Sequence, residues 1–201
     1  MTELFQCALP EVNTREVLRY MGCKDADAEI AAMLADVLDE CRGVFDRSAV
    51  CYTEVAVEYE NERLLIGGCS VESGDLKKAL GECQRALLFG ATVGVGIDRL
   101  IARYSRVSPS RALCLQALGA ERIEALCDAF CDEYAKKAER VGERLRPRFS
   151  AGYGDLSLAV QKDWFRILDC HKKIGLSLNE SLMMSPAKSV TAIAGIEKLK
   201  V

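Results

Sequence analysis

The segment from Val50 to Tyr59 constrains the fold most strongly, because its residues alternate with a period of two. Side chains of an extended chain point to opposite faces in turn, so this segment is predicted to be a β-strand. Most other apolar residues recur every three or four positions, as they do in helices. Because the strands are not separated by regular helical crossovers, the fold class is predicted to be α+β, with an antiparallel or mixed twisted sheet flanked by helices.

The length and charge of the chain limit its domain organisation and its partners. Its 201 residues, half of them apolar, are enough for one sizeable core, so we expect a single domain over residues 1–201. The net charge of −3, from 27 basic and 30 acidic side chains, argues against general binding to nucleic acid or to an anionic membrane. The sequence has neither a membrane-spanning apolar run nor a signal-peptide start, so a cytoplasmic location is expected.

Capping residues and helical periodicity predict where the helices lie. Asn13 and Glu16 resemble a capping pair before a helix at 14–21, and a second helix is expected at 25–42. Further helices are expected after Ser73, from about 97 to 104, after Ser108-Pro109, and from about 160 to 170. Gly119 is expected to separate two helices, with the second beginning near Ala120. The basic run that follows, 136–148, is expected to be a solvated helix end.

The remaining strands are predicted from short apolar runs. Residues 63–66 are expected to return as the antiparallel partner of the Val50–Tyr59 strand, after a turn at 60–62. A buried strand is expected at 86–89, and two short strands at 182–184 and 190–196, on either side of Pro186. A glycine-rich bend from Gly90 to Gly96 lies between the 86–89 strand and a helix, where phosphates often bind. It matches neither common phosphate-loop motif, and Asp98 would repel a phosphate, so close backbone packing is preferred here.

The ten cysteines are scattered and form no paired C-x-x-C clusters. In a cytoplasmic protein such residues act as small buried hydrophobes. Cys127 and Cys131 could share one face of a helix, but zinc needs further ligands and the sole histidine, His171, is distant in sequence. No metal site is predicted.

The loop from Arg148 to Asp155 has the composition of a binding loop. Arg148 carries a planar charged group that suits a carboxylate or a phosphate, and Gly152 allows a ligand to approach the backbone. Tyr153 offers a ring that can stack and a hydroxyl group that can form hydrogen bonds. The alternative is a turn between two helices, with Arg148 as a solvated end-cap.

Two motifs together resemble a known family. Arg148-x-x-x-Gly152-Tyr153 is followed about thirty residues later by the segment from Asn179-Glu180-Ser181 to Ser189-Val190. In this order and at this distance they resemble the R-x-x-x-G-Y and T-E-S-x-x-M-x-P-x-x-S-V motifs of the C-terminal activation domain of cobalamin-dependent methionine synthase. The resemblance is strongest over residues 146–196.

The resemblance implies a function and a set of binding residues. Domains of this family bind S-adenosylmethionine and help to restore methylcobalamin from the inactive Co(II) corrinoid, with one electron from a donor. Arg148 would pair with the carboxylate of the methionyl group, the backbone at Ala151 and Gly152 would approach the ligand, and Tyr153 would pack on it. Glu180 would make a polar contact near the ligand or the corrinoid, or would instead cap a turn.

The sequence also departs from the family. The residues after Tyr153 are Gly154-Asp155-Leu156 instead of a proline-containing segment, and the acidic partner of the ligand's amino group has no clear match, Gln84 being nearest. The cobalamin motif D-x-H-x-x-G is missing. The chain is therefore predicted to be an accessory part of a methyltransferase system. It would serve a separate corrinoid-binding methionine synthase or methyltransferase together with an electron donor protein.

The alternative function is a non-enzymatic binding module of the same fold. Such a module would recognise another small anion or only a protein partner.

Overall fold

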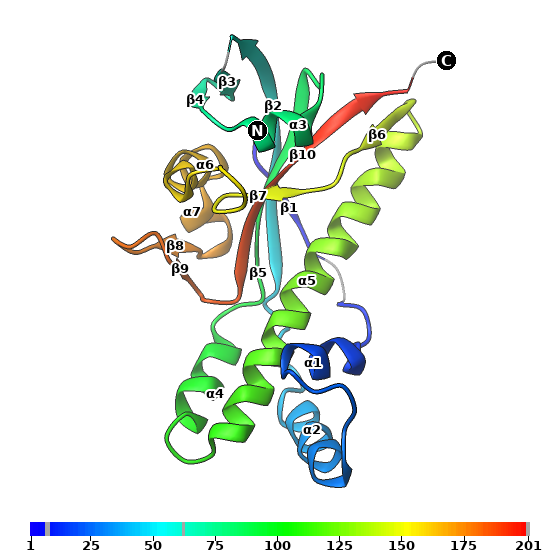
Figure 1. Ribbon diagram of the computed structural model, residues 1–201, viewed down its shortest axis with the longest axis vertical. Coiled ribbons are helices and arrows are strands. Elements are labelled where there is room, and N and C mark those ends of the chain that lie inside the picture. Colours follow the sequence, from blue (N-terminus) through cyan, green and yellow to red (C-terminus); the bar gives the residue numbers. More distant parts are fainter. Residues whose placement is uncertain (7–8, 62, 200–201) are drawn as a thin grey trace.

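A long antiparallel sheet forms the centre of the molecule (Figure 1). The computed structural model describes residues 1–6, 9–61 and 63–199. Cys7 and part of the predicted turn at 60–62 lie outside these ranges. The strand order is β4-β3-β2-β5-β10-β6, with β1 beside β2 and β7 beside β10. These strands are β1 (Glu3–Phe5), β2 (Ala49–Glu60), β3 (Arg63–Ile66), β4 (Cys69–Val71), β5 (Arg85–Thr92), β6 (Glu143–Leu145), β7 (Phe149–Ser150) and β10 (Ser189–Lys198).

The central strand β5 is buried on both faces. Leu87 and Phe89 face one hydrophobic core, while Ala86 and Leu88 face the other. The strand pairs with β2 on one side and with β10 on the other, so that Gly90 lies between Cys51 and Thr191. A strand covered by helices on both faces reads as a continuous apolar run, which explains the composition of this segment.

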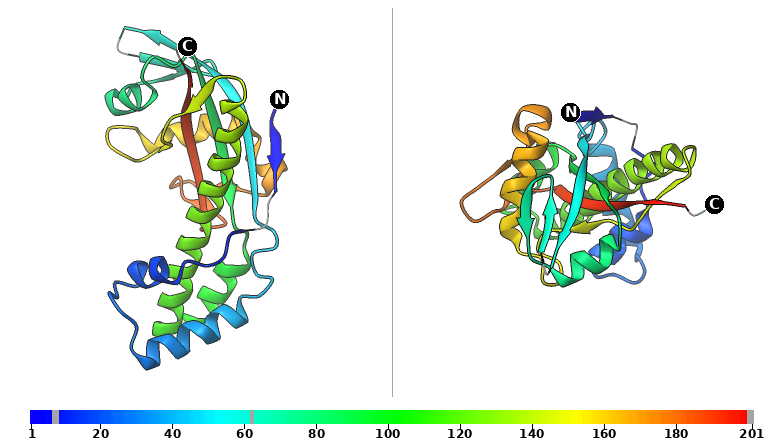
Figure 2. Two further views of the ribbon diagram at one scale, coloured as in Figure 1. Left: turned by 90° about the vertical axis from the view of Figure 1, so that its right-hand side faces the viewer. Right: turned by 90° about the horizontal axis from the view of Figure 1, so that it is seen from above.

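Helices cover both faces of the sheet, and Figure 2 shows α5 running along its length. On one face the C-terminal half of the long α5 (Pro109–Glu139) packs against the strands, while α1 (Thr14–Tyr20), α2 (Ala28–Glu40) and α4 (Gly96–Tyr104) pack against the rest of α5 beyond the end of the sheet (Figure 1). Phe130 of α5 packs against Phe5, Tyr52 and Phe89, with ring centroids 5.0 to 5.2 Å apart. The other face is covered by α3 (Gly74–Leu80), α6 (Gln161–Leu168), preceded by a 3₁₀ turn (Leu158–Val160), and α7 (Cys170–Ile174). Trp164 of α6 is fully buried there.

Most predicted elements are confirmed. The strand at Val50–Tyr59, its hairpin partner and the helices at 14–21 and 25–42 are present within one or two residues at most ends. Asn13 and Ser73 accept hydrogen bonds from Glu16 N and Leu76 N, as expected of N-caps. Among the described helices, none has both the length and the apolar composition needed to cross a membrane.

The predicted break at Gly119 is wrong. Helix α5 runs through this residue without interruption for 31 residues. A Cβ atom at Gly119 would lie 3.0 Å from Cγ of Lys188 and 3.2 Å from Cγ1 of Ile97, so the glycine allows other chain segments to approach the helix. Such a contact can outweigh the helix-propensity cost of glycine, which is about 1 kcal/mol.

Three segment predictions need correction. The strand predicted at 86–89 spans Arg85–Thr92, so three of the seven residues of the Gly90–Gly96 bend belong to β5. The basic run 136–148 leaves the helix at Glu139 and then forms β6. The strand predicted at 182–184 is only Met184–Ser185 (β9), because Leu182 has a positive φ of 62° in the turn after β8 (Ser177–Leu178).

Gly96 lets the N-terminus of α4 approach the connection between α2 and β2. A Cβ atom at this position would lie 2.9 Å from the backbone oxygen of Val44 and 3.0 Å from its Cγ1. We expect Gly96→Ala to lower the free energy of unfolding by about 1–3 kcal/mol, because backbone must move to relieve the overlap. Denaturant unfolding measures the change, with Val95→Ala at the exposed neighbouring position as the control. An unchanged stability would show that this contact is looser than the structure indicates.

Candidate functional site

A pocket of about 410 Å³ lies where the loop after β7 meets the start of β10. Arg148, Ala151 and Tyr153, three of the five predicted site residues, line it. The first turn of α6, one side of α5 and strand β9 complete the wall. The remaining lining residues are Glu124, Phe149, Ser150, Gln161, Met184, Ser189, Val190 and Thr191.

Backbone hydrogen bonds hold the loop in a compact turn. Gly152 has a φ of 88°, and its N–H donates to the Leu156 carbonyl at 2.9 Å. The N–H of Leu156 donates to the Tyr153 carbonyl at 3.0 Å. Ala151 and Leu156 are buried, whereas Tyr153 is 70% exposed at the rim of the pocket. The glycine is therefore needed for the turn, and the tyrosine ring is left free to contact a ligand or a partner.

Asp155 anchors this loop to α3. Its carboxylate accepts hydrogen bonds from the Ser73 hydroxyl group, from Gly74 N at 2.8 Å and from Asp75 N at 3.2 Å. The hydrogen bond from Ser73, with those from the two backbone N–H groups, holds the pKa of Asp155 below its ordinary value. Asp155, which departs from the motif of the methionine synthase activation domain, therefore has a structural role.

Arg148 already has two carboxylate partners in the chain. Its Nη1 donates to Asp128 Oδ1 at 2.5 Å, and its Nη2 donates to Glu124 Oε2. Both acidic residues come from α5, one helical turn apart. The Arg148 side chain is 25% exposed, compared with 43% for Glu124 and 67% for Asp128. Arg148 and Glu124 thus place a positive and a negative charge together at the pocket wall.

Glu180 lies in the exposed turn between β8 and β9 and does not line the pocket. In that turn the Asn179 side chain accepts a hydrogen bond from Met183 N at 2.9 Å, so Asn179 makes the cap that was considered for Glu180. Ser189 is buried and donates to Thr92 Oγ1 or to the Pro186 carbonyl, both at 2.8 Å, so its hydroxyl group has a structural role at the start of β10.

Sequence reasoning did not find Glu124, Asp128, Gln161 or Thr191. Glu124 and Asp128 have the same spacing as many solvated helix residues, and nothing in the sequence links them to a loop twenty residues later. Cys127 and Cys131 lie on the same helix, and the described part of the chain contains no group of three His, Cys, Asp or Glu residues that could hold a metal ion.

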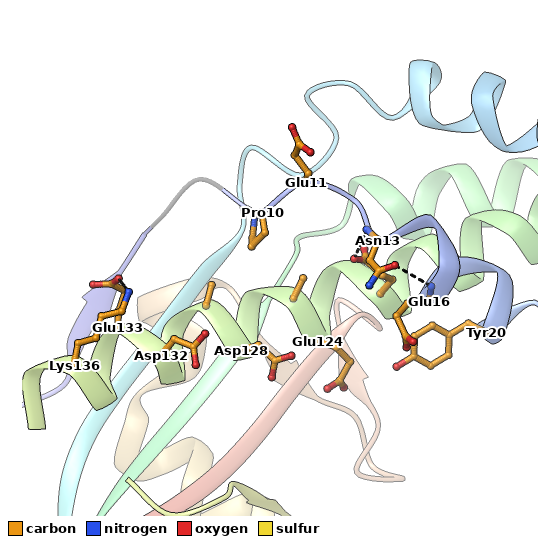
Figure 3. Close-up of a pocket in the computed structure, with 13 residues that line it drawn as sticks. Pro10, Glu11, Asn13, Glu16, Tyr20, Glu124, Asp128, Asp132, Glu133 and Lys136 are labelled. Atoms are coloured by element: carbon orange, nitrogen blue, oxygen red, sulfur yellow. Dashed lines mark hydrogen bonds and ion pairs between the residues drawn. The ribbon is translucent and has the colours of Figure 1, made fainter. Parts of the chain in front are cut away.

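A second, wider groove of about 680 Å³ follows α5 beside the pocket (Figure 3). Acidic side chains project into it from successive turns of the helix, and Glu124 belongs to both hollows. The acidic lining residues are Glu11, Glu16, Glu121, Glu124, Asp128, Asp132 and Glu133. Five of them, Glu16, Glu121, Glu124, Asp128 and Glu133, already pair with basic side chains of the chain.

Solved structures include one with the same fold. The crystal structure of the MetH reactivation domain bound to AdoHcy matches this chain with a TM-score of 0.69 at 13% sequence identity. The match covers 97% of this chain and 78% of that one. No family model matches the sequence, and no curated protein matches it. The likeness confirms the predicted α+β fold and the resemblance to the methionine synthase activation domain at the level of the fold.

The cap made by Asp155 is expected to make stability depend on pH. Because the pKa is lowered in the folded protein, the contribution is fully present above the pKa of an unfolded aspartate, about 3.9, and is lost as the pH falls through the lower folded value. Asp155→Ala should lower the melting temperature at pH 7, and the difference from the wild type should shrink below pH 4. Thermal unfolding from pH 7 to pH 3 measures this, with the exposed Glu58→Ala as the control. A difference that is constant with pH would contradict the assigned cap.

Proposed function

We propose that the pocket at the Arg148–Tyr153 loop binds S-adenosylmethionine. The observation that supports this most directly is that Arg148 and Glu124 lie together in a pocket of about 410 Å³, within the size range of small-molecule sites. The amino-acid part of S-adenosylmethionine carries one carboxylate and one ammonium group, and so needs opposite charges side by side. A protein of the same fold was crystallised with the closely related AdoHcy, which differs by the transferred methyl group.

An exchange of ion pairs would accommodate the ligand. Its carboxylate would take the place of Glu124 or Asp128 on the guanidinium group of Arg148, where two parallel hydrogen bonds can form. The released carboxylate would then accept the ligand's ammonium group, so that ion pairs are exchanged without being lost. The acidic side chains of α5 also favour the positively charged sulfonium group, and the exposed Tyr153 ring can contact that cation.

The rest of the proposal concerns what the bound ligand is for. The chain would hold the methyl group of S-adenosylmethionine for transfer to a corrinoid carried by a separate methionine synthase or methyltransferase in the cytoplasm. The corrinoid would supply the cobalt that accepts the methyl group, a donor protein would supply one electron, and S-adenosylhomocysteine would be released. The contribution of this chain is to position the ligand rather than to transfer a proton.

The occupied state of Arg148 favours a second candidate function. Both terminal nitrogens of its side chain are bonded to carboxylates of the chain itself. A binding module of the same fold that recognises only a protein partner would need no exchange of these ion pairs, whereas one that recognises another small anion through Arg148 would need the same exchange.

Arg148→Ala is expected to weaken S-adenosylmethionine binding by about 2 kcal/mol or more, and Arg148→Lys should not restore it. Calorimetric titration measures the affinity, with Arg166→Ala on the exposed side of α6 as the control. The free energy of unfolding of Arg148→Ala should fall by only about 0.5–1 kcal/mol, because the ion pairs that Arg148 makes are partly exposed. If Arg148→Ala binds with the affinity of the wild type, or if the wild type does not bind at millimolar ligand, the proposed site is contradicted and the second candidate function is favoured.

The surface around the pocket is expected to contact the corrinoid protein. Tyr153, which lines the pocket, is 70% exposed. Met183, which precedes the lining residue Met184, is 62% exposed. Cross-linking with a corrinoid-dependent methionine synthase should place contacts at 148–155 and 180–188. Contacts confined to α1 and α2 would contradict this docking arrangement.

A further inference from the structure

Two polar side chains of the pocket have buried atoms without a hydrogen-bond partner. Gln161 begins α6 and is 4% exposed, and Thr191 lies in β10 and is 1% exposed. In the described part of the chain, Gln161 Oε1 and Thr191 Oγ1 make no hydrogen bond, although both residues line the pocket. Such an atom costs free energy unless a partner is provided, and a ligand in the pocket can provide it.

The position of these two atoms separates them from other unpartnered atoms. Four buried side-chain atoms in the described ranges lack a partner, and the other two belong to Trp164 and Arg111. Trp164 packs in the core beneath α6, and Arg111 binds Glu40 through Nη2, so neither lines the pocket. Of these four atoms in the described ranges, only those of Gln161 and Thr191 belong to residues that line one cavity, and the two residues come from a helix and a strand distant in sequence.

The edge of the sheet at this place is also open. Strand β7 pairs with β10 only at Ala192 and Ile193, and β6 pairs with it only from Ile196 onward. On that side of β10, none of the described strands pairs with the segment from Ser189 to Thr191, all of which lines the pocket. Backbone donors and acceptors on an open strand edge can pair with a ligand that presents its own donors and acceptors.

We propose that Gln161 and Thr191 recognise the nucleoside half of the ligand. This inference rests on the proposed function and adds the residues that would select a nucleoside. A glutamine oxygen only accepts hydrogen bonds, and a threonine hydroxyl group donates or accepts, so both suit the neutral hydroxyl groups of ribose and the amino group of adenine. The charged amino-acid half of the ligand is matched by Arg148 and Glu124 instead.

The test compares two variants with three probes: S-adenosylmethionine, 5′-methylthioadenosine and methionine. Thr191→Val and Gln161→Leu should each lower the affinity for the two nucleosides roughly 3- to 10-fold, the value of one neutral hydrogen bond. The affinity for methionine should not change. Thr191→Ser keeps the hydroxyl group and should bind like the wild type. The ligand-free Thr191→Val protein should melt no lower than the wild type, because no hydrogen bond within the protein is lost.

The outcomes separate this inference from the proposed function. Wild-type protein that binds S-adenosylmethionine, with both variants unchanged, overturns the inference alone. Binding of 5′-methylthioadenosine without S-adenosylmethionine, and with the expected variant losses, overturns the proposed function and supports the inference. Binding of neither nucleoside overturns both. If ligand-free Thr191→Val melts at a lower temperature than the wild type, the Thr191 hydroxyl group stabilises the empty protein, and this result would count against the inference. If Gln161→Leu does not fold, the Thr191 variants decide the test.

Discussion

The pairing of β10 with β5 is the contact on which the rest of the structure depends. The two strands are in register from Ser189 opposite Thr92 to Ile196 opposite Arg85, although about a hundred residues separate them in sequence. This pairing places the last part of the described chain between β5 and the short strands β6 and β7, with helices on both faces of the sheet. The same pairing brings the Ser189–Thr191 edge to the loop after β7, and the pocket forms between them. The candidate site is therefore a product of long-range strand pairing.

Structure and binding compete within that site. Arg148 is held by Glu124 and Asp128, which makes the loop stable on the side of α5 but occupies the guanidinium group that a ligand carboxylate would use. Gln161 and Thr191 show the opposite condition, because each has a buried atom without a partner in the described structure. Functional sites often combine such features, since groups arranged for a ligand cannot also be optimal for the empty protein.

Some positions could be predicted because their signal is local. The alternation in β2, the caps at Asn13 and Ser73, and the glycine turn at Gly152 each depend on a few neighbouring residues. The role of Gly119 has no local signal, because it is a contact with Lys188 and Ile97, which lie in other elements. Glu124 and Asp128 were missed for the same reason, since their partner Arg148 lies beyond the end of α5. Asp155 departs from the family motif, and its carboxylate caps a helix about eighty residues earlier in the chain.

By itself, the sequence determined the α+β class, most helices, the central strands and the loop that contains Arg148, Ala151, Gly152 and Tyr153. These depend on periodicity, capping and backbone freedom, which act over a few residues. Only the tertiary structure decided that three of these four residues line a pocket, that Glu180 lies outside it, and that Glu124, Gln161 and Thr191 belong to it. Those facts depend on the packing of α5, α6 and β10 around the loop, and contacts between distant segments leave no periodic signal in a single sequence.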